Sequence, residues 1–266
     1  MEDNEARNSE VSLEDQYMNI SLENEEEEDL IYDQGVEDLS EVDARWCLVG
    51  RFLTDRCFDF QAMQHKMASL WRPGRGVYVK ELEQNRYLFQ FYHEVDISRV
   101  MEGSPWTFDR VPLVFERLKV GENPRAMVLN RLHFWVQLHG MTPGFMSERM
   151  VRDIGNRIGD FVESDLNNFN GVWRDYMRIR VLLNVDLPVK RKMNIKNQNG
   201  QICCVQFKYE DLTTFCFICG ILGHSERFCE KIFDTPQHLL VKLYGLGIKA
   251  APRRRNHTIG SQWLRQ

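Results

Sequence analysis

Three cysteines and one histidine within fourteen residues constrain this chain more than any other feature of its sequence. Cys216, Cys219, His224 and Cys229 follow the spacing C-x2-C-x4-H-x4-C. Three thiolates and one imidazole complete the tetrahedral shell that Zn²⁺ prefers, and a shell of four protein ligands leaves no position for a catalytic water. The spacing therefore predicts one structural zinc ion per chain.

Two glycines inside the same segment support this interpretation over a chance grouping of four residues. Gly220 and Gly223 permit the positive φ angles that so short a metal-binding loop requires. A segment of this length has no core of its own. We therefore expect its fold to come from the metal, whose binding contributes roughly 10–16 kcal/mol in comparable peptides.

Charge is distributed very unevenly along the chain. Residues 1–43 contain seventeen acidic residues and one basic residue, Arg7, for a net charge of −16. Since the whole chain of 266 residues carries −5, the remainder carries +11. The acidic segment has too few apolar residues to offset the entropy of ordering, so we expect it to be disordered, with a transient helix near Leu13–Ile20. The basic remainder is suited to a polyanion, although solubility alone would also account for its charge.

Targeting signals and membrane spans are not evident in the sequence. No stretch approaches eighteen consecutive apolar residues, and the start at Met1 has neither the basic end nor the apolar stretch of a signal peptide. We therefore expect an intracellular protein, nuclear or cytoplasmic, that is not secreted and does not contact a membrane. In a reducing compartment the four cysteines outside the metal segment are expected to be buried thiols: Cys47, Cys57, Cys203 and Cys204.

Apolar periodicity from Trp46 onwards predicts a first α+β domain over residues 44–120. A buried strand at residues 46–53 precedes an amphipathic helix at residues 60–71. Two strands (residues 77–82 and 86–92), a short helix with Asp96 as its N-cap and Gly103 as its end, and a strand at residues 111–118 follow. The order β-α-β-β-α-β is that of a ferredoxin-like fold, to which RNA-recognition domains also belong.

A second, smaller α+β unit is predicted over residues 126–211. Residues 132–138 alternate as a strand should, and Thr142 is the predicted cap of a helix that begins at Pro143 and ends at Gly159. Strands are expected at residues 161–165, 176–185 and 203–209. A hairpin that contains Lys190-Arg191-Lys192 joins the last two and turns at Asn199-Gly200. The metal segment (215–230) and a basic C-terminal tail (231–266) complete the chain.

Because zinc in this setting is structural, function must lie in the surface around it. Phe217 lies between the first two metal ligands, where its ring could stack on an unpaired base, and Arg227 could reach a phosphate. Further bases that continue the positive potential are Lys231, Arg253, Arg254 and Arg255. The alternative is that Phe217 belongs to a miniature core and that the arginines form a solvated tail.

Other candidate residues are weaker. Arg178, Arg180 and Lys208 alternate with apolar residues, so they form either one basic stripe or an ordinary solvated face. The rings of Tyr87, Phe89 and Phe91 are better explained as core than as base-stacking residues. No sequence pattern typical of a nucleophile, a phosphate-binding loop or a catalytic metal survives inspection, so we expect no enzymatic activity.

The metal segment resembles the CCHC zinc knuckles of retroviral nucleocapsid proteins. It shares their pattern Cys-aromatic-x-Cys-Gly-x-x-Gly-His and a base two residues before the last cysteine. One departure concerns the position just after the histidine, where those knuckles usually carry a second apolar contact and this chain has Ser225 and Glu226. We call residues 215–230 the knuckle.

The region before the knuckle resembles a plant domain of unknown function. The resemblance is carried by Leu48–Leu53, Tyr87–Phe91, Glu102–Trp106 and Phe134–Gly140, and it covers about residues 44–230. That domain precedes a CCHC knuckle in the first open reading frame of LINE-type retrotransposons and in host proteins derived from them. The resemblance implies a role in RNA binding or ribonucleoprotein formation, without catalytic residues.

Two functions are compatible with these observations. The first is zinc-dependent binding of single-stranded nucleic acid, RNA or DNA, by a retrotransposon-derived protein. The second is a protein-interaction adaptor in which zinc holds a docking surface, with self-association or a basic protein as the partner of the acidic tail. The basic residues after the knuckle favour the first, and the acidic tail favours the second.

Overall fold

The structure is a computed structural model that describes residues 44–170, 174–196 and 200–251. The chain divides into a unit of Met1–Val42 and a unit of Asp43–Gln266, and all described residues belong to the second. The predictions for the acidic tail and for Arg253–Arg255 lie outside the described residues. None of the helices described is long and apolar enough to cross a membrane.

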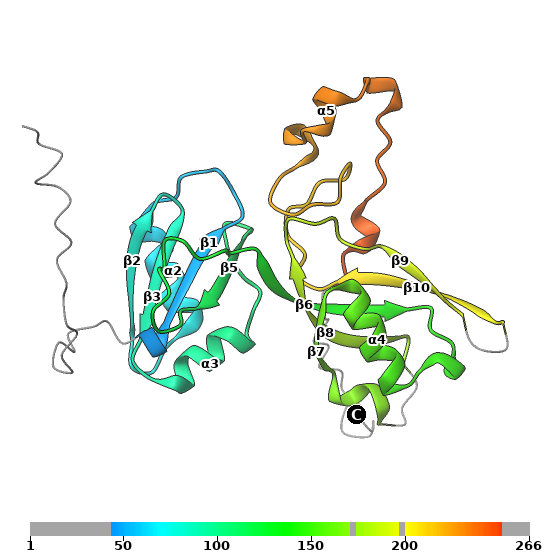
Figure 1. Cartoon of the computed structure of the whole chain (residues 1–266), viewed down its shortest axis with the longest axis horizontal. Helices are drawn as coiled ribbons and strands as arrows, with labels where there is room; N and C mark the ends of the chain where they lie inside the picture. Colours follow the sequence, from blue (N-terminus) through cyan, green and yellow to red (C-terminus); the bar gives the residue numbers. More distant parts are fainter. Residues whose placement is uncertain (1–43, 171–173, 197–199, 252–266) are drawn as a thin grey trace, which may run out of the picture. The chain divides into compact units, whose positions relative to one another are not determined.

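The described residues form an α+β protein with two antiparallel sheets (Figure 1). The first sheet has the strand order β2-β3-β1-β5-β4, and its sequence order includes two helices, α2 and α3. The bounds are β1 Cys47–Phe52, α2 Phe60–Trp71, β2 Val77–Glu83, β3 Arg86–Phe91, α3 Glu94–Glu102, β4 Trp106–Phe108 and β5 Val111–Arg117. The short strand β4, between α3 and β5, is an addition to the six elements predicted from the sequence.

Both helices of this sheet cover the same face, and aromatic side chains fill the space beneath them. Met63, Met67 and Trp71 of α2 pack with Ile97 and Val100 of α3. Strand β3 contributes three rings, those of Tyr87, Phe89 and Phe91, which are at most 2% exposed. The interpretation of these rings as core residues is therefore confirmed.

Asp96 does not cap α3, contrary to the sequence-based expectation. The helix begins at Glu94, and the side chain of His93 accepts a hydrogen bond from the N–H of Val95. Asp96 is buried instead, and its carboxylate accepts hydrogen bonds from the N–H groups of Gly74 (2.9 Å) and Arg75 (3.0 Å). The residue therefore anchors the loop after α2, because a buried carboxylate requires donors.

The second sheet has the strand order β7-β8-β6-β10-β9. Its elements are β6 Arg131–His139, α4 Glu148–Ile158, β7 Asp160–Ser164, β8 Tyr176–Asn184, β9 Lys192–Lys196 and β10 Ile202–Tyr209. The strand β9 was not predicted as a strand. Helix α4 begins later than predicted: Pro143–Phe145 form a separate 3-10 turn in which Thr142 makes no side-chain cap, and Ser147 caps α4 by accepting from Met150 (3.3 Å).

The two sheets repeat one strand order. If β6 to β10 are matched with β1 to β5, the order β2-β3-β1-β5-β4 becomes β7-β8-β6-β10-β9. Helix α4 corresponds to α2, while no helix lies between β8 and β9 where α3 would have its counterpart. Residues from beyond β10, including Phe215, Leu222 and Ile248, belong to the same buried cluster as the core side chains of β6, β8 and β10.

Burial corrects two further expectations. Cys47 and Cys203 are buried as predicted, but Cys57 and Cys204 are exposed. Cys204 is exposed because successive side chains of a strand point to opposite faces, and its neighbour Cys203 takes the position that faces the core.

Candidate metal centre

The knuckle follows β10 as a tight loop with its own backbone pairing. Phe215 and Leu222 form an antiparallel bridge, and the N–H of Cys216 donates to the carbonyl of Ile221 (2.9 Å). Gly220 and Gly223 have φ angles of +79° and +93°, as the sequence analysis required. A 3-10 turn, Glu226–Phe228, then leads to Cys229.

This loop brings the four predicted ligands together. The ligand atoms of Cys216, Cys219, His224 and Cys229 all lie within 4.8 Å of one another. The three cysteines are buried, with exposed fractions of 0–6%. Buried thiols next to an imidazole, with no disulfide among the described residues, form a set of soft donors suited to a tetrahedral metal ion.

Backbone amides polarise one sulfur of the cluster. The N–H groups of Ile218 and Cys219 point at Sγ of Cys216, at 3.4 and 3.5 Å. Burial raises the pKa of the Cys216 thiol, but these amides and the neighbouring thiols outweigh it, so the pKa lies below its usual value. Burial, together with the neighbouring thiolate, raises the pKa of Cys219 to about 12. Several thiolates at such close range need a cation between them.

The knuckle is docked on the second sheet and does not hang free. The N–H of Val189 donates to the carbonyl of Gly220 (3.0 Å), and the N–H of Tyr244 donates to that of Phe217 (3.0 Å). The Tyr244 ring lies so close to Gly220 that a Cβ built there would be 2.2 Å from it. The expectation that metal alone holds this segment is therefore incomplete, because packing from both sides contributes.

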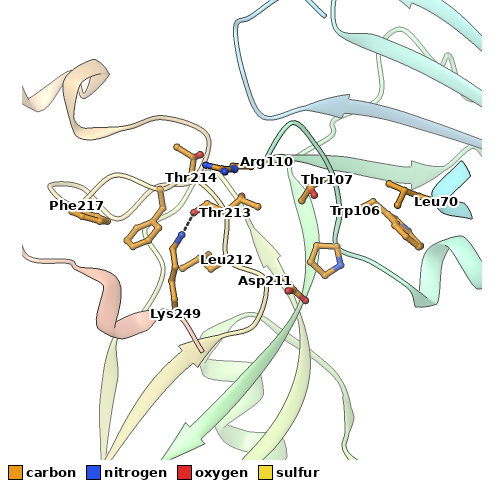
Figure 2. A pocket seen from close by; sticks show the side chains of 12 residues that line it. Leu70, Trp106, Thr107, Arg110, Asp211, Leu212, Thr213, Thr214, Phe217 and Lys249 are labelled. Atoms are coloured by element: carbon orange, nitrogen blue, oxygen red, sulfur yellow. Dashed lines mark hydrogen bonds between the residues drawn. The ribbon is translucent and has the colours of Figure 1, made fainter. Parts of the chain in front are cut away.

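Phe217 is half-buried in this arrangement. Its ring centroid lies 5.0 Å from that of Phe215, and it packs against the core of the second sheet. Figure 2 shows Phe217 in the wall of a pocket, near Lys249, whose amine donates to the carbonyl of Thr213 (2.9 Å). Burial lowers the pKa of Lys249, which acts as a structural contact.

The outer side of the knuckle carries an exposed ring that the sequence analysis did not single out. Phe228, directly before the last ligand, is 72% exposed, and its neighbour Arg227 is also exposed. Lys231 is exposed two residues after Cys229. The pattern of metal ligands gave no signal for Phe228, because its exposure depends on the 3-10 turn that turns it outward.

The two arginines of β8, Arg178 and Arg180, do not form an ordinary solvent-exposed face. Arg178 is only 14% exposed; it pairs with Asp165 (3.0 Å) and Glu210 (2.8 Å), and its guanidinium lies 3.6 Å from the ring centroid of Trp135. Arg180 is 6% exposed and pairs with Glu163 at 3.2 Å. These two arginines are therefore largely occupied by partners.

Two families of known proteins match this chain. Residues 40–126 match a family described as "Domain of unknown function (DUF4283)", and residues 183–231 match a family described as "Zinc knuckle". The second match begins at the end of β8, so it includes the hairpin β9–β10 on which the knuckle is docked. A domain of unknown function followed by a zinc knuckle is thus shown, in agreement with the resemblance noted in the sequence.

Similar individual proteins are distant. An uncharacterized protein of Arabidopsis thaliana is 22% identical over 144 residues, which cover 54% of this chain and 45% of that protein. The chain therefore spans less than half the length of this relative. A solved structure of RNA-recognition domains 1 and 2 of Sex-lethal from Drosophila melanogaster is 14% identical, with coverage of 51% of this chain and 84% of the other. Its TM-score of 0.23 is too low to carry an argument.

Proposed function

We propose that this chain is a zinc-dependent, non-enzymatic protein that binds single-stranded nucleic acid, RNA in preference to DNA, inside the cell. The observation that carries the proposal is the cluster of four ligand atoms within 4.8 Å in a segment that matches the zinc-knuckle family. Three thiolates and one imidazole fit Zn²⁺, which such a site binds with all four positions filled by protein. The ion then shapes a surface and takes no part in a reaction.

The exposed side of the knuckle fits an unpaired nucleotide. Phe228 offers a free ring, and base stacking on an aromatic ring contributes about 1–3 kcal/mol per base. Arg227 and Lys231 flank it with positive charge for phosphates. Because Phe217 is half-buried between Phe215 and the core, Phe228 is the better stacking residue.

A retrotransposon origin is part of the same proposal. It is supported by the resemblance of the region before the knuckle to the first-open-reading-frame proteins of LINE-type elements. Sequencing the genomic surroundings of the coding region would test it: a reverse-transcriptase reading frame or its remnant downstream is expected. Related copies that lack any such neighbour throughout a genome would contradict the origin while leaving the binding activity untouched.

Binding of labelled oligonucleotides to the purified, zinc-loaded chain tests the activity. Single-stranded RNA, single-stranded DNA and duplex are compared over a range of salt concentrations. If the knuckle surface and the adjoining bases neutralise about three to six phosphates, the logarithm of affinity falls with the logarithm of salt with a slope of roughly −2 to −4. No binding, or an affinity that salt does not change, would reject the proposal.

Two exposed phenylalanines make a matched pair for the same assay. Phe228→Ala should weaken binding by about 1–3 kcal/mol if its ring stacks on a base. Phe233→Ala removes an equally large ring that is 86% exposed and five residues further on, so it controls for general loss of apolar surface. Equal losses for the two variants would argue against stacking on the knuckle.

One observation favours the adaptor as a second candidate. The segment after the knuckle exposes several large apolar side chains: Phe233 (86%), Leu239 (59%), Val241 (66%), Leu243 (52%) and Leu246 (68%). Contiguous exposed apolar residues are typical of protein–protein contact. If Leu243→Ser and Leu246→Ser change the oligomeric state and leave nucleic-acid binding unaltered, the chain has the adaptor function in addition to nucleic-acid binding. If the unaltered chain binds no oligonucleotide, the adaptor function replaces the proposed one.

A further inference from the structure

One face of the second sheet has no helix of that sheet on it; at Arg180 it meets the end of α3, where the carbonyl of Met101 accepts a hydrogen bond from the guanidinium (2.9 Å). The side chains of β6, β8 and β10 alternate, so that one set enters the core beneath α4 and the other points to the opposite face. On that opposite face, His139 of β6 is paired with Tyr176 of β8 on one side and with Gln206 of β10 on the other. The three strands therefore present these residues in one row.

Two aromatic rings lie together in this row. The ring centroids of His139 and Tyr176 are 5.0 Å apart with an angle of 34° between the planes, and both residues are partly exposed. Burial lowers the pKa of His139, Lys208 lowers it further, and Asp175 acts in the opposite direction. The imidazole is therefore uncharged at neutral pH and offers a flat ring with polar edges.

Positive charge borders these rings on the side of β10 and β9. Lys208 is paired with Gln137, two residues along the strands from the pair of Gln206 and His139 and on the same face of the sheet. On the other side of β10, Lys192 is paired with Gln206. Neither lysine forms an ion pair with another described residue, in contrast to Arg178, which is occupied by Asp165 and Glu210. The strands β9 and β10 contain no acidic residue. The amines are thus available to an anionic ligand.

The corresponding face of the first sheet is built differently. Where β6 and β8 carry His139 and Tyr176, the matching strands β1 and β3 present apolar side chains, including Val49 and Leu88. Those side chains are buried, in one cluster with Leu129 of the segment that links the sheets. The two sheets share a strand order, but this face is apolar and buried in the first sheet, whereas in the second sheet it carries aromatic rings and amines.

We propose that the face of the second sheet around His139, Tyr176, Lys192 and Lys208 is a binding site for single-stranded nucleic acid, separate from the knuckle. Bases stack on the two rings, and Lys192 and Lys208 contact phosphates. Proteins that bind unpaired strands with little sequence preference commonly combine aromatic rings, on which bases stack, with basic side chains that contact the phosphates. The site extends the proposed function to a second surface, and none of the four metal ligands belongs to it.

Binding of the full chain to a dodecamer of uridine and to an abasic strand of equal length tests this site. The double variant His139→Ala, Tyr176→Ala should bind oligouridine roughly 5- to 100-fold more weakly, the range expected for loss of base stacking, and should bind the abasic strand unchanged. The double variant Lys192→Gln, Lys208→Gln should weaken both ligands and lower the salt slope by about one to two. Tyr78→Ala and Lys80→Gln, exposed positions on β2, should change neither.

A measurement on the unaltered chain guards against variants that fail to fold. Photocrosslinking to an oligonucleotide that contains 4-thiouridine should label peptides with His139 or Tyr176 as well as the knuckle. Labelling of the knuckle alone, or a ring variant that binds like the unaltered chain while Phe228→Ala binds weakly, would overturn the sheet site and leave the proposed function standing. Displacement of oligouridine by polyglutamate at equal charge would make an acidic peptide the ligand and also overturn the site.

Discussion

At the scale of single residues, the metal centre depends on how closely neighbouring rings approach its backbone. Gly220 combines a φ of +79° with contact to the Tyr244 ring, and Gly200, in the turn between β9 and β10, has a φ of +80° with open space around it. The two glycines thus have almost the same φ angle and differ in the atoms that a new side chain would meet. This pair separates backbone strain from packing.

We predict that Gly220→Ala weakens zinc binding and destabilises the second sheet far more than Gly200→Ala does. Both variants incur the strain of a positive φ, about 1 kcal/mol. Only Gly220→Ala must also displace Tyr244, since the new Cβ would lie 2.2 Å from its ring. Competition with a chromophoric chelator and thermal unfolding measure the two effects. Equal losses would mean that Tyr244 does not clamp the knuckle.

His133 gives the second sheet a dependence on pH. Burial lowers its pKa to about 4, with Arg180 contributing, and its Nδ1 has no hydrogen-bond partner among the described residues. In the unfolded chain His133 is therefore protonated below about pH 6.5, whereas in the folded chain it stays neutral down to about pH 4. Stability falls as pH decreases through this window and is constant above it, as far as this residue is concerned.

We predict that His133→Gln reduces this acid sensitivity. The full shift sets an upper limit of about 3 kcal/mol, and partial exposure lowers the expected gain at pH 4.5 to about 1–2 kcal/mol relative to pH 7.5. Urea unfolding at the two pH values, monitored by fluorescence, measures the difference. An unchanged pH profile would show that other groups dominate the acid response.

At the scale of elements, the second sheet is held on its polar face by one arginine. Arg178 joins Asp165, after β7, to Glu210, after β10, and its guanidinium covers the ring of Trp135 on β6. Desolvation disfavours its charge, but the two carboxylates outweigh that effect and raise its pKa. This side chain therefore ties the segment after the edge strand β7 to the segment after β10.

We predict that Arg178→Met destabilises the chain by about 2–4 kcal/mol, because two largely buried carboxylates lose the guanidinium that neutralises them. The matched control is Arg149→Met on α4, whose side chain is 93% exposed and 4.0 Å from Asp153. That change should cost less than about 0.5 kcal/mol. Chemical denaturation of both variants measures the contrast, and a similar loss for Arg149→Met would contradict the assignment.

The elements that could be predicted from the sequence are those with enough residues to show a period. Helix α2 and strands β1, β3 and β5 lie within a residue or so of their expected bounds. Strand β4 was missed because three residues show no alternation. Strand β9 was missed because the run Lys190-Arg191-Lys192, whose last residue begins the strand, was assigned to the connection of a hairpin.

The sequence was sufficient to propose the ligands of the candidate metal site, but it did not predict which side chains surround them. Spacing along the chain determines which cysteines and histidine can meet, and the ligand atoms of the four predicted residues do lie within 4.8 Å of one another. The exposure of Phe228, the burial of Phe217 and the clamp by Tyr244 depend on contacts between segments distant in sequence. Asp96 was misassigned for the same reason, since its donors lie more than twenty residues away.

At the scale of the whole molecule, metal binding and the second sheet are coupled through shared packing. Phe215 and Leu222, which flank the first two ligands, belong to the same core cluster as Val205 and Phe207 of β10. The first sheet has a core of its own under α2 and α3, and it contributes to the shared cluster only side chains of its other face, such as Val49 and Leu88. Loss of the metal should therefore affect the two sheets unequally.

We predict that removing zinc with a chelator increases hydrogen exchange in β8 and β10 by at least tenfold, with a smaller change in β1 and β3. A stabilising ligand bound to the folded state shifts the local equilibrium by mass action, so its removal exposes the elements packed on the knuckle. Exchange measured by mass spectrometry, peptide by peptide, tests this. Increased exchange confined to residues 215–230 would show that the knuckle unfolds independently of the sheet.

The segment beyond the knuckle also completes the second sheet, because Lys249 bridges to Tyr209 and the N–H of Ala250 donates to the Tyr209 carbonyl (2.9 Å). During translation, the first sheet has all its strands once residue 117 has left the ribosome. The second sheet gains its last contacts only when residue 250 has emerged, and domains generally fold in the order of their synthesis. A nascent chain would thus carry a first sheet with all its strands while the second still lacked the segment that closes it.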